Sequence, residues 1–271
     1  MGIQLFQYDG KRALVVGGAT GMGAAVARLV TNLGGEVTVF DIADVNFPVA
    51  ASAPVDLRDR NSVDEALASL DHRIDALFMC AGVADGTPGL MVINFIAQRH
   101  IVDSLVTSGV LAAGSSISMI SSLASLGWQV RLLQIQEFLA TPDWESAVEW
   151  IAGHEGVDNY RFSKRAINAY VAQRALELVT AGIRINAVDP SLTDTPLSRA
   201  NEDTWFKFGA DYRAETGLDP LLPEQLAYPL AFLCSDAASG ITGTSIPVEQ
   251  GLVGSAITGT FKAPGITERL R

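Results

Sequence analysis

Residue types that build covalent or metal centres are scarce in this sequence. Cysteine occurs only at Cys80 and Cys234, which is too few for a disulfide framework, and no CxxC or paired His/Cys spacing indicates zinc. The three histidines lie far apart and follow no ligand pattern. We therefore expect no metal site, and we interpret both cysteines as small core residues.

Positive charge is also scarce. Lys and Arg number 19 against 30 Asp and Glu, so the formal net charge is −11 at pH 7. A chain of this charge repels phosphate backbones and anionic lipid, so we expect neither nucleic acid nor a membrane surface as a partner. The charge places no limit on a small-molecule ligand.

Long apolar runs are missing as well. No run approaches the roughly 20 residues that span a bilayer, and residues 1–6 lack the basic and apolar segments of a signal peptide. We therefore expect a cytoplasmic protein. The chain has 271 residues, 48% hydrophobic and 18% charged, which suits one globular domain over residues 1–271.

Short apolar runs alternate with helical patterns along the chain. Strands are expected at 12–16, 36–40, 53–55, 74–79, 115–120, 183–188 and 244–248. Helices are expected at 21–33, 61–70, 94–106, 159–179 and 223–234. This alternation predicts an α/β protein with a doubly wound parallel sheet, a Rossmann fold. Its ligand is expected at the carboxyl ends of the strands.

Residues 129–156 interrupt the alternation. Thr141 is a plausible N-cap, Pro142 suits the first helical position, and an apolar face begins at Trp144. A shorter helix is expected at about 130–140. We interpret the segment as a helical insertion that packs either on its own domain or on another subunit.

A glycine-rich loop lies between the first strand and the first helix. Glycines let the backbone approach a pyrophosphate, and the helix N-terminus offers free N–H groups and a positive dipole. A plain tight turn is the alternative. We predict a dinucleotide site with contacts from Gly17, Thr20, Gly21, Met22 and Gly23.

Asp41 ends the second strand. A carboxylate there can accept hydrogen bonds from the adenosine ribose and repels a 2′-phosphate, which favours NAD over NADP; a helix or turn cap is the alternative. Further cofactor contacts are expected along the same edge from Ile42, Asp56, Leu57, Ala81 and Gly82.

Tyr160 and Lys164 are four residues apart on one expected helix and share a face. A phenol has a pKa of about 10, and a nearby ammonium favours the phenolate that a general base requires. A solvated pair is the alternative. Ser122 closes the fifth strand and brings a hydroxyl to the ligand edge, although a cap would also explain it.

Together these motifs resemble the short-chain dehydrogenase/reductase family over nearly the whole chain. The family's TGxxxGxG motif reads VGxxxGxG from Val16 to Gly23, and its YxxxK motif runs from Tyr160 to Lys164. Its NNAG motif reads MCAG at 79–82, without the two asparagines that steady the sheet. The resemblance implies the catalytic residues Asn94, Ser122, Tyr160 and Lys164.

The family's PG segment appears here as PSLTDT at 190–195, with Ser191 in place of glycine. The resemblance implies cofactor contacts from Pro190, Leu192, Thr193 and Thr195, of which the last three would face the nicotinamide carboxamide. Tyr160 and Lys164 would also contact the cofactor.

The spacing of Ser122 and Tyr160, 38 positions, is long for this family because of the insertion. It resembles the subgroup of bacterial 3-alpha-hydroxysteroid dehydrogenase/carbonyl reductase and coniferyl-alcohol dehydrogenase-like proteins. In that subgroup the insertion is expected to cover the helix face that other members use to build tetramers. The resemblance therefore implies a homodimer.

The expected function is NAD-dependent interconversion of an alcohol and its carbonyl by hydride transfer, on an apolar substrate such as a hydroxysteroid or aromatic alcohol. Ser122 would hold the substrate oxygen and Tyr160 would act as the base. Lys164 would bind the ribose and lower the tyrosine pKa, and Asn94 would hold a water on the proton path. A non-catalytic NAD-binding regulator and an NAD-dependent epimerase are the alternatives.

Overall fold

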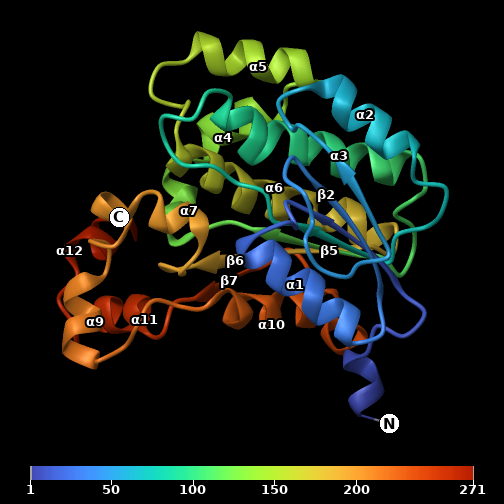
Figure 1. Cartoon of the computed structure of the whole chain (residues 1–271). Helices are drawn as coiled ribbons and strands as arrows, with labels where there is room; N and C mark the ends of the chain where they lie inside the picture. The colour runs from blue at the N-terminus through green and yellow to red at the C-terminus, as the bar shows by residue number, and fades with distance from the viewer. Residues whose placement is uncertain (1, 271) are drawn as a thin grey trace.

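One parallel sheet organises the computed structural model, which describes residues 2–270 (Figure 1). The strand order is β3-β2-β1-β4-β5-β6-β7. The strands are β1 (Arg12–Val16), β2 (Glu36–Asp41), β3 (Ala51–Pro54), β4 (Ala76–Met79), β5 (Ser116–Ile120), β6 (Arg184–Pro190) and β7 (Ser245–Val248). The predicted doubly wound sheet is confirmed, and its order reverses between β1 and β4, where such sheets bind ligands.

Helices cover both faces of the sheet because alternate strand residues point to opposite sides. Ala13 and Val15 face α1 (Gly21–Asn32) and α10 (Pro223–Cys234). Leu14 and Val16 face the opposite layer. That layer contains α2 (Arg60–Ala68), α3 (Ala97–Thr107) and α6 (Tyr160–Thr180). Both layers are visible in Figure 1.

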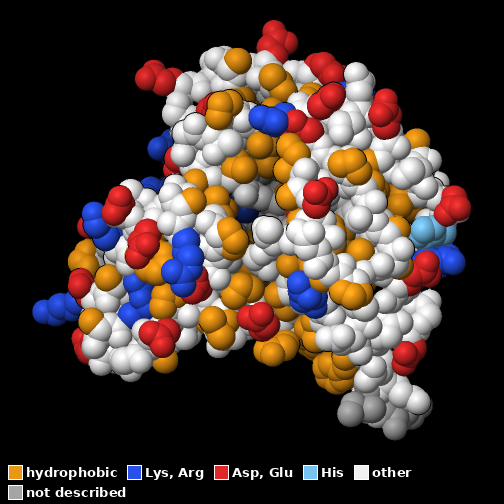
Figure 2. Space-filling model, in the orientation of Figure 1, with side chains coloured by type: hydrophobic (Ala, Val, Ile, Leu, Met, Phe, Trp, Pro, Cys, Tyr) orange, Lys and Arg blue, Asp and Glu red, His pale blue; other side chains and the backbone are white. Residues whose placement is uncertain are grey.

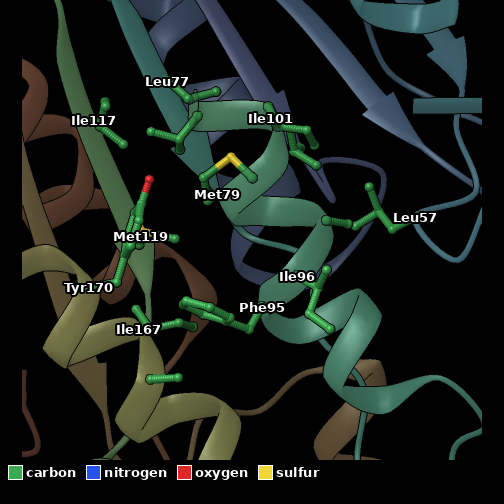
Figure 3. Packing of buried hydrophobic residues seen from close by; sticks show 14 of the residues in the cluster. Leu57, Leu77, Met79, Phe95, Ile96, Ile101, Ile117, Met119, Ile167 and Tyr170 are labelled. Atoms are coloured by element: carbon green, nitrogen blue, oxygen red, sulfur yellow. The ribbon is translucent and has the colours of Figure 1, made fainter. Parts of the chain in front are cut away.

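The core between the sheet and the second layer is continuous. Figure 3 shows side chains of β4 and β5 pointing toward those of α3 and α6. Phe95 lies at the centre and is fully buried, with its ring centroid 5.8 Å from that of Tyr170. The central strands are buried on both faces, as expected of a covered parallel sheet. This packing fixes α6 relative to the ends of the strands.

The insertion forms two helices, α4 (Leu132–Leu139) and α5 (Trp144–Gly153), that pack on their own domain. Phe138 of α4 is fully buried and its ring centroid lies 5.7 Å from that of Phe162 in α6. The prediction of Thr141 as N-cap is wrong. Its hydroxyl donates to Phe138 O at the end of α4, and Asp143 caps α5 by accepting from Ser146 N, 2.8 Å away.

Short turns and helices connect these main elements. Turns are η1 (Ile3–Phe6), η2 (Val92–Ile96, π-helical), η3 (Leu123–Ser125), η4 (Trp128–Arg131), η5 (Asp236–Ala238) and η6 (Glu268–Leu270). Short helices are α7 (Pro196–Arg199), α8 (Glu202–Trp205), α9 (Ala210–Thr216), α11 (Leu252–Thr258) and α12 (Pro264–Thr267). These five short helices were not predicted, whereas α10, which also follows β6, was. Figure 1 shows α7, α9, α11 and α12 as a lobe beside the sheet.

Within residues 2–270, no helix combines the length and the apolar character needed to cross a bilayer.

Candidate active site

A cavity of about 360 Å³ opens at the carboxyl ends of β1, β2 and β4. Figure 2 shows this face of the molecule hollowed beside the lobe of α7, α9 and α12. Most of the residues expected to contact the cofactor line the cavity. They are Gly17, Thr20, Gly21, Met22, Gly23, Asp41, Ile42, Asp56, Leu57, Ala81, Gly82 and Thr195.

Two positions of the glycine loop have no room for a side chain. Gly17 has a φ of +80°, and a Cβ there would lie 2.4 Å from Ala81 N. A Cβ on Gly23 would lie 2.0 Å from Gly17 O. The Thr20 side chain does not cap α1, and no acidic residue lies in the first turn. The backbone N–H groups there are thus available to an anion, which fits the pyrophosphate of a dinucleotide.

Asp41 bridges the glycine loop and the end of β2. Its Oδ2 accepts from Ala19 N at 2.8 Å, and its Oδ1 accepts from Ala43 N at 2.9 Å. A carboxylate has about four acceptor sites, so two remain for ribose hydroxyls. Sequence reasoning missed Arg58, the one cation in this wall, whose Nη2 donates to Asp56 Oδ2 at 2.6 Å.

A second cavity of about 210 Å³ adjoins the first, because Met22, Thr195 and Leu197 line both. Five more of the predicted site residues line this second cavity, namely Ser122, Tyr160, Pro190, Leu192 and Thr193. Leu123, Trp205 and Phe208 make much of its wall apolar. The Tyr160 and Trp205 ring centroids are 5.2 Å apart, so an aromatic ring from α8 lies over the phenol.

Tyr160 is held at the first position of α6 by two caps. Asn159 Oδ1 accepts from Phe162 N at 2.9 Å, and Asp85 Oδ1 accepts from Tyr160 N at 2.6 Å. Both oxygens lie at the positive end of the helix, where negative charge is favourable. Asp85 was not predicted, because its role depends on the loop after β4 meeting a helix 75 positions later.

Lys164 lies near the phenol and hydrogen-bonds to the last residue of β5. Its Nζ donates to Ile120 O at 2.8 Å and lies 5.5 Å from the Tyr160 ring centroid. Burial raises the pKa of Tyr160 to about 12, while a hydrogen bond with Ser122 opposes this rise. The lowering of the Tyr160 pKa by Lys164 stays a prediction.

Asn94 lies in the π-helical turn η2 and is fully buried. Its Oδ1 accepts from Val83 N at 2.8 Å, and its Nδ2 donates to Val83 O at 3.0 Å and to Ser163 Oγ at 3.2 Å. Ser163 Oγ in turn donates to Tyr160 O at 2.7 Å. Both Nδ2 hydrogens are used, so this side chain ties the loop after β4 to α6. The water at Asn94 stays a prediction.

Comparison with known proteins matches both halves of the chain. Residues 13–141 match a model described as the NAD dependent epimerase/dehydratase family, and residues 146–253 match one described as enoyl-(acyl carrier protein) reductase. Coniferyl-alcohol dehydrogenase of Pseudomonas sp. is 23% identical, over 93% of this chain and 100% of that protein. The 3-alpha-hydroxysteroid dehydrogenase/carbonyl reductase of Comamonas testosteroni is 27% identical, over 88% and 95%. The chain belongs to the short-chain dehydrogenase/reductase family.

Two further similarities bear on this member of the short-chain dehydrogenase/reductase family. Cis-4-hydroxycyclohexanecarboxylate dehydrogenase of Sinomonas cyclohexanicum is 29% identical, over 88% of this chain and 95% of that protein. The crystal structure of 3-alpha-hydroxysteroid dehydrogenase from Pseudomonas sp. B-0831 complexed with NADH shares the fold, with a TM-score of 0.73 and 20% identity over 93% and 100% of the chains. As a short-chain dehydrogenase/reductase, the protein is an oxidoreductase of alcohols or carbonyl compounds that uses a nicotinamide cofactor.

Behind the cavities of this short-chain dehydrogenase/reductase lies a buried polar cluster around Lys164. Burial lowers the pKa of Lys164 to about 8, and Asp189 opposes this fall. Asp189 is 4% exposed, and burial raises its pKa to about 6. Asn168 Nδ2 donates to Asp189 Oδ2 at 3.0 Å, whereas Oδ1 has no hydrogen-bond partner among the described residues. Asp189 thus keeps a compensating negative charge near the lysine.

Sequence reasoning missed Asp189 although one signal was available. A carboxylate stands directly before Pro190 at the end of a buried strand, where an apolar residue is expected. Lys164 and Asn94 line neither cavity, but a Cβ on Gly82 would lie 3.7 Å from Asn94 Oδ1 and from Lys164 Nζ. Both groups therefore lie directly beneath the cavity wall.

Proposed function

We propose that this protein is an NAD-dependent dehydrogenase/reductase that interconverts an alcohol and its carbonyl on a small apolar substrate. One observation carries the proposal. Ser122 and Tyr160 line a largely apolar cavity that adjoins the glycine-lined cavity, so a substrate and a dinucleotide can meet there. A regulator that only bound NAD would not require these two hydroxyl groups in an adjoining cavity.

The proposed chemistry divides between the cofactor and the chain. A bound nicotinamide supplies the hydride acceptor or donor and, when oxidised, a positive charge beside the phenol. During oxidation, Ser122 Oγ holds the substrate oxygen and the Tyr160 phenolate takes its proton while the carbinol carbon loses a hydride, which leaves a carbonyl. The positive charge of Lys164 favours the phenolate form of Tyr160. Reduction reverses each step.

Asp41 supports NAD as the cofactor. Its carboxylate lines the cavity beside the glycine loop, and Arg58, the one cation in that wall, is already paired with Asp56. A 2′-phosphate beside Asp41 would therefore meet a negative charge with no free compensating cation among the described lining residues.

We expect wild-type kcat/KM with NAD to exceed that with NADP by about 100-fold, and Asp41→Ser to reduce this ratio by roughly 10- to 100-fold, because a charge-assisted hydrogen bond and a repulsion are both lost. Initial rates of reduced cofactor formation measure both values. Asp44→Ser, an exposed carboxylate three positions on, serves as the control. Comparable efficiency with NADP in the wild type would contradict the assignment.

The size of the second cavity favours a single-ring substrate. Its volume of about 210 Å³ is below the range of about 300–1,000 Å³ that drug-sized ligands fill. Two relatives are named for single-ring alcohols, coniferyl alcohol and cis-4-hydroxycyclohexanecarboxylate, and a third for a 3-alpha-hydroxysteroid. We therefore rank an aromatic or alicyclic alcohol ahead of a hydroxysteroid.

A panel of these three substrates with NAD tests the function. We expect NADH to form, faster with a single-ring alcohol than with the steroid, because the smaller molecule fits the cavity. Absorbance of NADH gives the rates. Oxidation of the steroid alone would contradict the ranking by size, whereas NAD binding without oxidation of any alcohol would favour the non-catalytic regulator. The relatives named here are dehydrogenases, which does not favour the epimerase.

We also propose a homodimer and a cytoplasmic location. Support for the dimer comes from the insertion, whose buried Ile135 and Phe138 pack α4 against α6. That face of α6 is therefore covered by the chain itself. A second copy cannot pack on it to build a tetramer.

A further inference from the structure

The second cavity contains a single charged group among its lining residues, the guanidinium of Arg269 near the end of the chain. The rest of the wall is apolar or carries hydroxyl groups, and none of it is acidic. Ile266 holds the C-terminal segment in a small core with Leu123 and Leu252. Because Leu123 follows Ser122, this anchor brings the guanidinium to the same cavity as the reacting hydroxyl groups.

Most of the hydrogen-bonding capacity of Arg269 is unused. A guanidinium has five N–H donors, yet the only acceptor within reach among residues 2–270 is Leu123 O, 3.5 Å from Nη1. The Arg269 Cζ lies 5.4 Å from the centroid of the Phe208 ring, which supports its flat face. A half-buried guanidinium with unused N–H donors is unfavourable unless an anion accepts hydrogen bonds from it and balances its charge.

Two further cations increase the positive potential at this place. Desolvation lowers the pKa of Arg269, and the charges of Arg161 and Arg165 lower it further. Arg165 Nη2 donates to Leu126 O at 3.3 Å, three residues from the Leu123 O that Arg269 contacts. Within residues 2–270, none of the three takes part in a salt bridge. In a protein of net charge −11, such a cluster concentrates positive potential at one cavity.

We propose that Arg269 binds a carboxylate of the substrate, so that the substrate is a small hydroxy acid or its keto acid with the reacting carbon at Ser122 and Tyr160. This inference rests on the proposed function and names its substrate class. The planar fork of a guanidinium matches a carboxylate through two parallel hydrogen bonds. The apolar wall around Trp205 and Leu192 would then contact the ring between the two polar ends.

The first test uses two substrates that differ in charge, cis-4-hydroxycyclohexanecarboxylate and its primary carboxamide, with NAD. In the wild type we expect kcat/KM for the acid to exceed that for the amide by about 10- to 100-fold, the range of one charge-assisted hydrogen bond. Arg269→Met, which keeps an unbranched stem over Phe208, should lower only the value for the acid. Arg269→Lys should restore part of it. Arg12→Met, at the amino end of β1, is the control and should leave the ratio unchanged.

The second test measures binding without turnover. Cyclohexanecarboxylate and cyclohexanecarboxamide have no hydroxyl group to oxidise, and each is titrated calorimetrically into the full chain with NAD present. We expect the acid to bind about 10-fold more tightly or better, and Arg269→Met to remove the difference. Higher ionic strength should weaken binding of the acid alone, a readout on the wild type that does not depend on any variant folding.

The outcomes separate this proposal from the proposed function. Equal affinity for acid and amide, or an equal loss of both in Arg269→Met, would mean that Arg269 only anchors the C-terminal segment and would overturn the carboxylate site. Oxidation of neutral alcohols that is indifferent to Arg269 and to salt would do the same while supporting the dehydrogenase. Arg269-dependent binding of the acid, without oxidation of any alcohol, would support the carboxylate site and overturn the dehydrogenase.

Discussion

Tyr160→Phe is expected to lower kcat by about 10²- to 10⁴-fold, the contribution of a positioned general acid or base. The substitution removes only the phenolic oxygen, so the ring that lies 5.2 Å from Trp205 keeps its packing. The cofactor cavity is lined by other residues and should bind NAD as before. NADH formation gives kcat, and calorimetry gives the dissociation constant of NAD.

Tyr228→Phe is the matched control, because Tyr228 is 60% exposed on α10 and lines neither of the two cavities of the site. It should leave kcat unchanged. Substantial turnover in Tyr160→Phe would refute Tyr160 as the base. Loss of NAD binding together with turnover would instead show that the phenol holds the cofactor, and kcat would then say nothing about proton transfer.

Gly23→Ala is expected to abolish dinucleotide binding and to destabilise the fold. A Cβ at this position would lie 2.0 Å from Gly17 O and 3.0 Å from Gly18 Cα, and neither backbone atom can move without distorting the loop. Overpacking of this kind costs about 1–3 kcal/mol, or roughly 2–10 °C in Tm for a chain of this size. Thermal unfolding and calorimetric titration with NAD measure the two effects.

Gly254→Ala provides an unusually close control. Gly254 is the third residue of α11 as Gly23 is the third of α1, but it is exposed and a Cβ there meets nothing within 4 Å. Alanine at Gly254 should leave NAD binding unchanged and leave Tm unchanged or slightly higher, because alanine favours a helix over glycine. If Gly23→Ala binds NAD like the wild type, the loop does not have the close approach described here.

The positions of the strands and long helices could be predicted because their signals are local. Apolar runs and helical periodicity located β1, α1 and α6 within a few residues, and parallel connections require helices on both faces. The glycine loop, Asp41 and the Tyr160/Lys164 spacing were found in the same way. Boundaries were less certain, as the cap of α5 shows, since Thr141 was predicted as the N-cap whereas the structure has Asp143 there, two positions later.

The sequence by itself determined the fold class, the family and the residues of the glycine loop and the YxxxK pair, because each depends on neighbours a few positions apart. Only the tertiary structure decided which groups surround them. It placed Asp189 beside Lys164, Asp85 at the start of α6 and Arg269 in the substrate cavity. These side chains come from distant segments, and the pairing of strands and the packing of the C-terminal lobe bring them together, so no local pattern records their proximity.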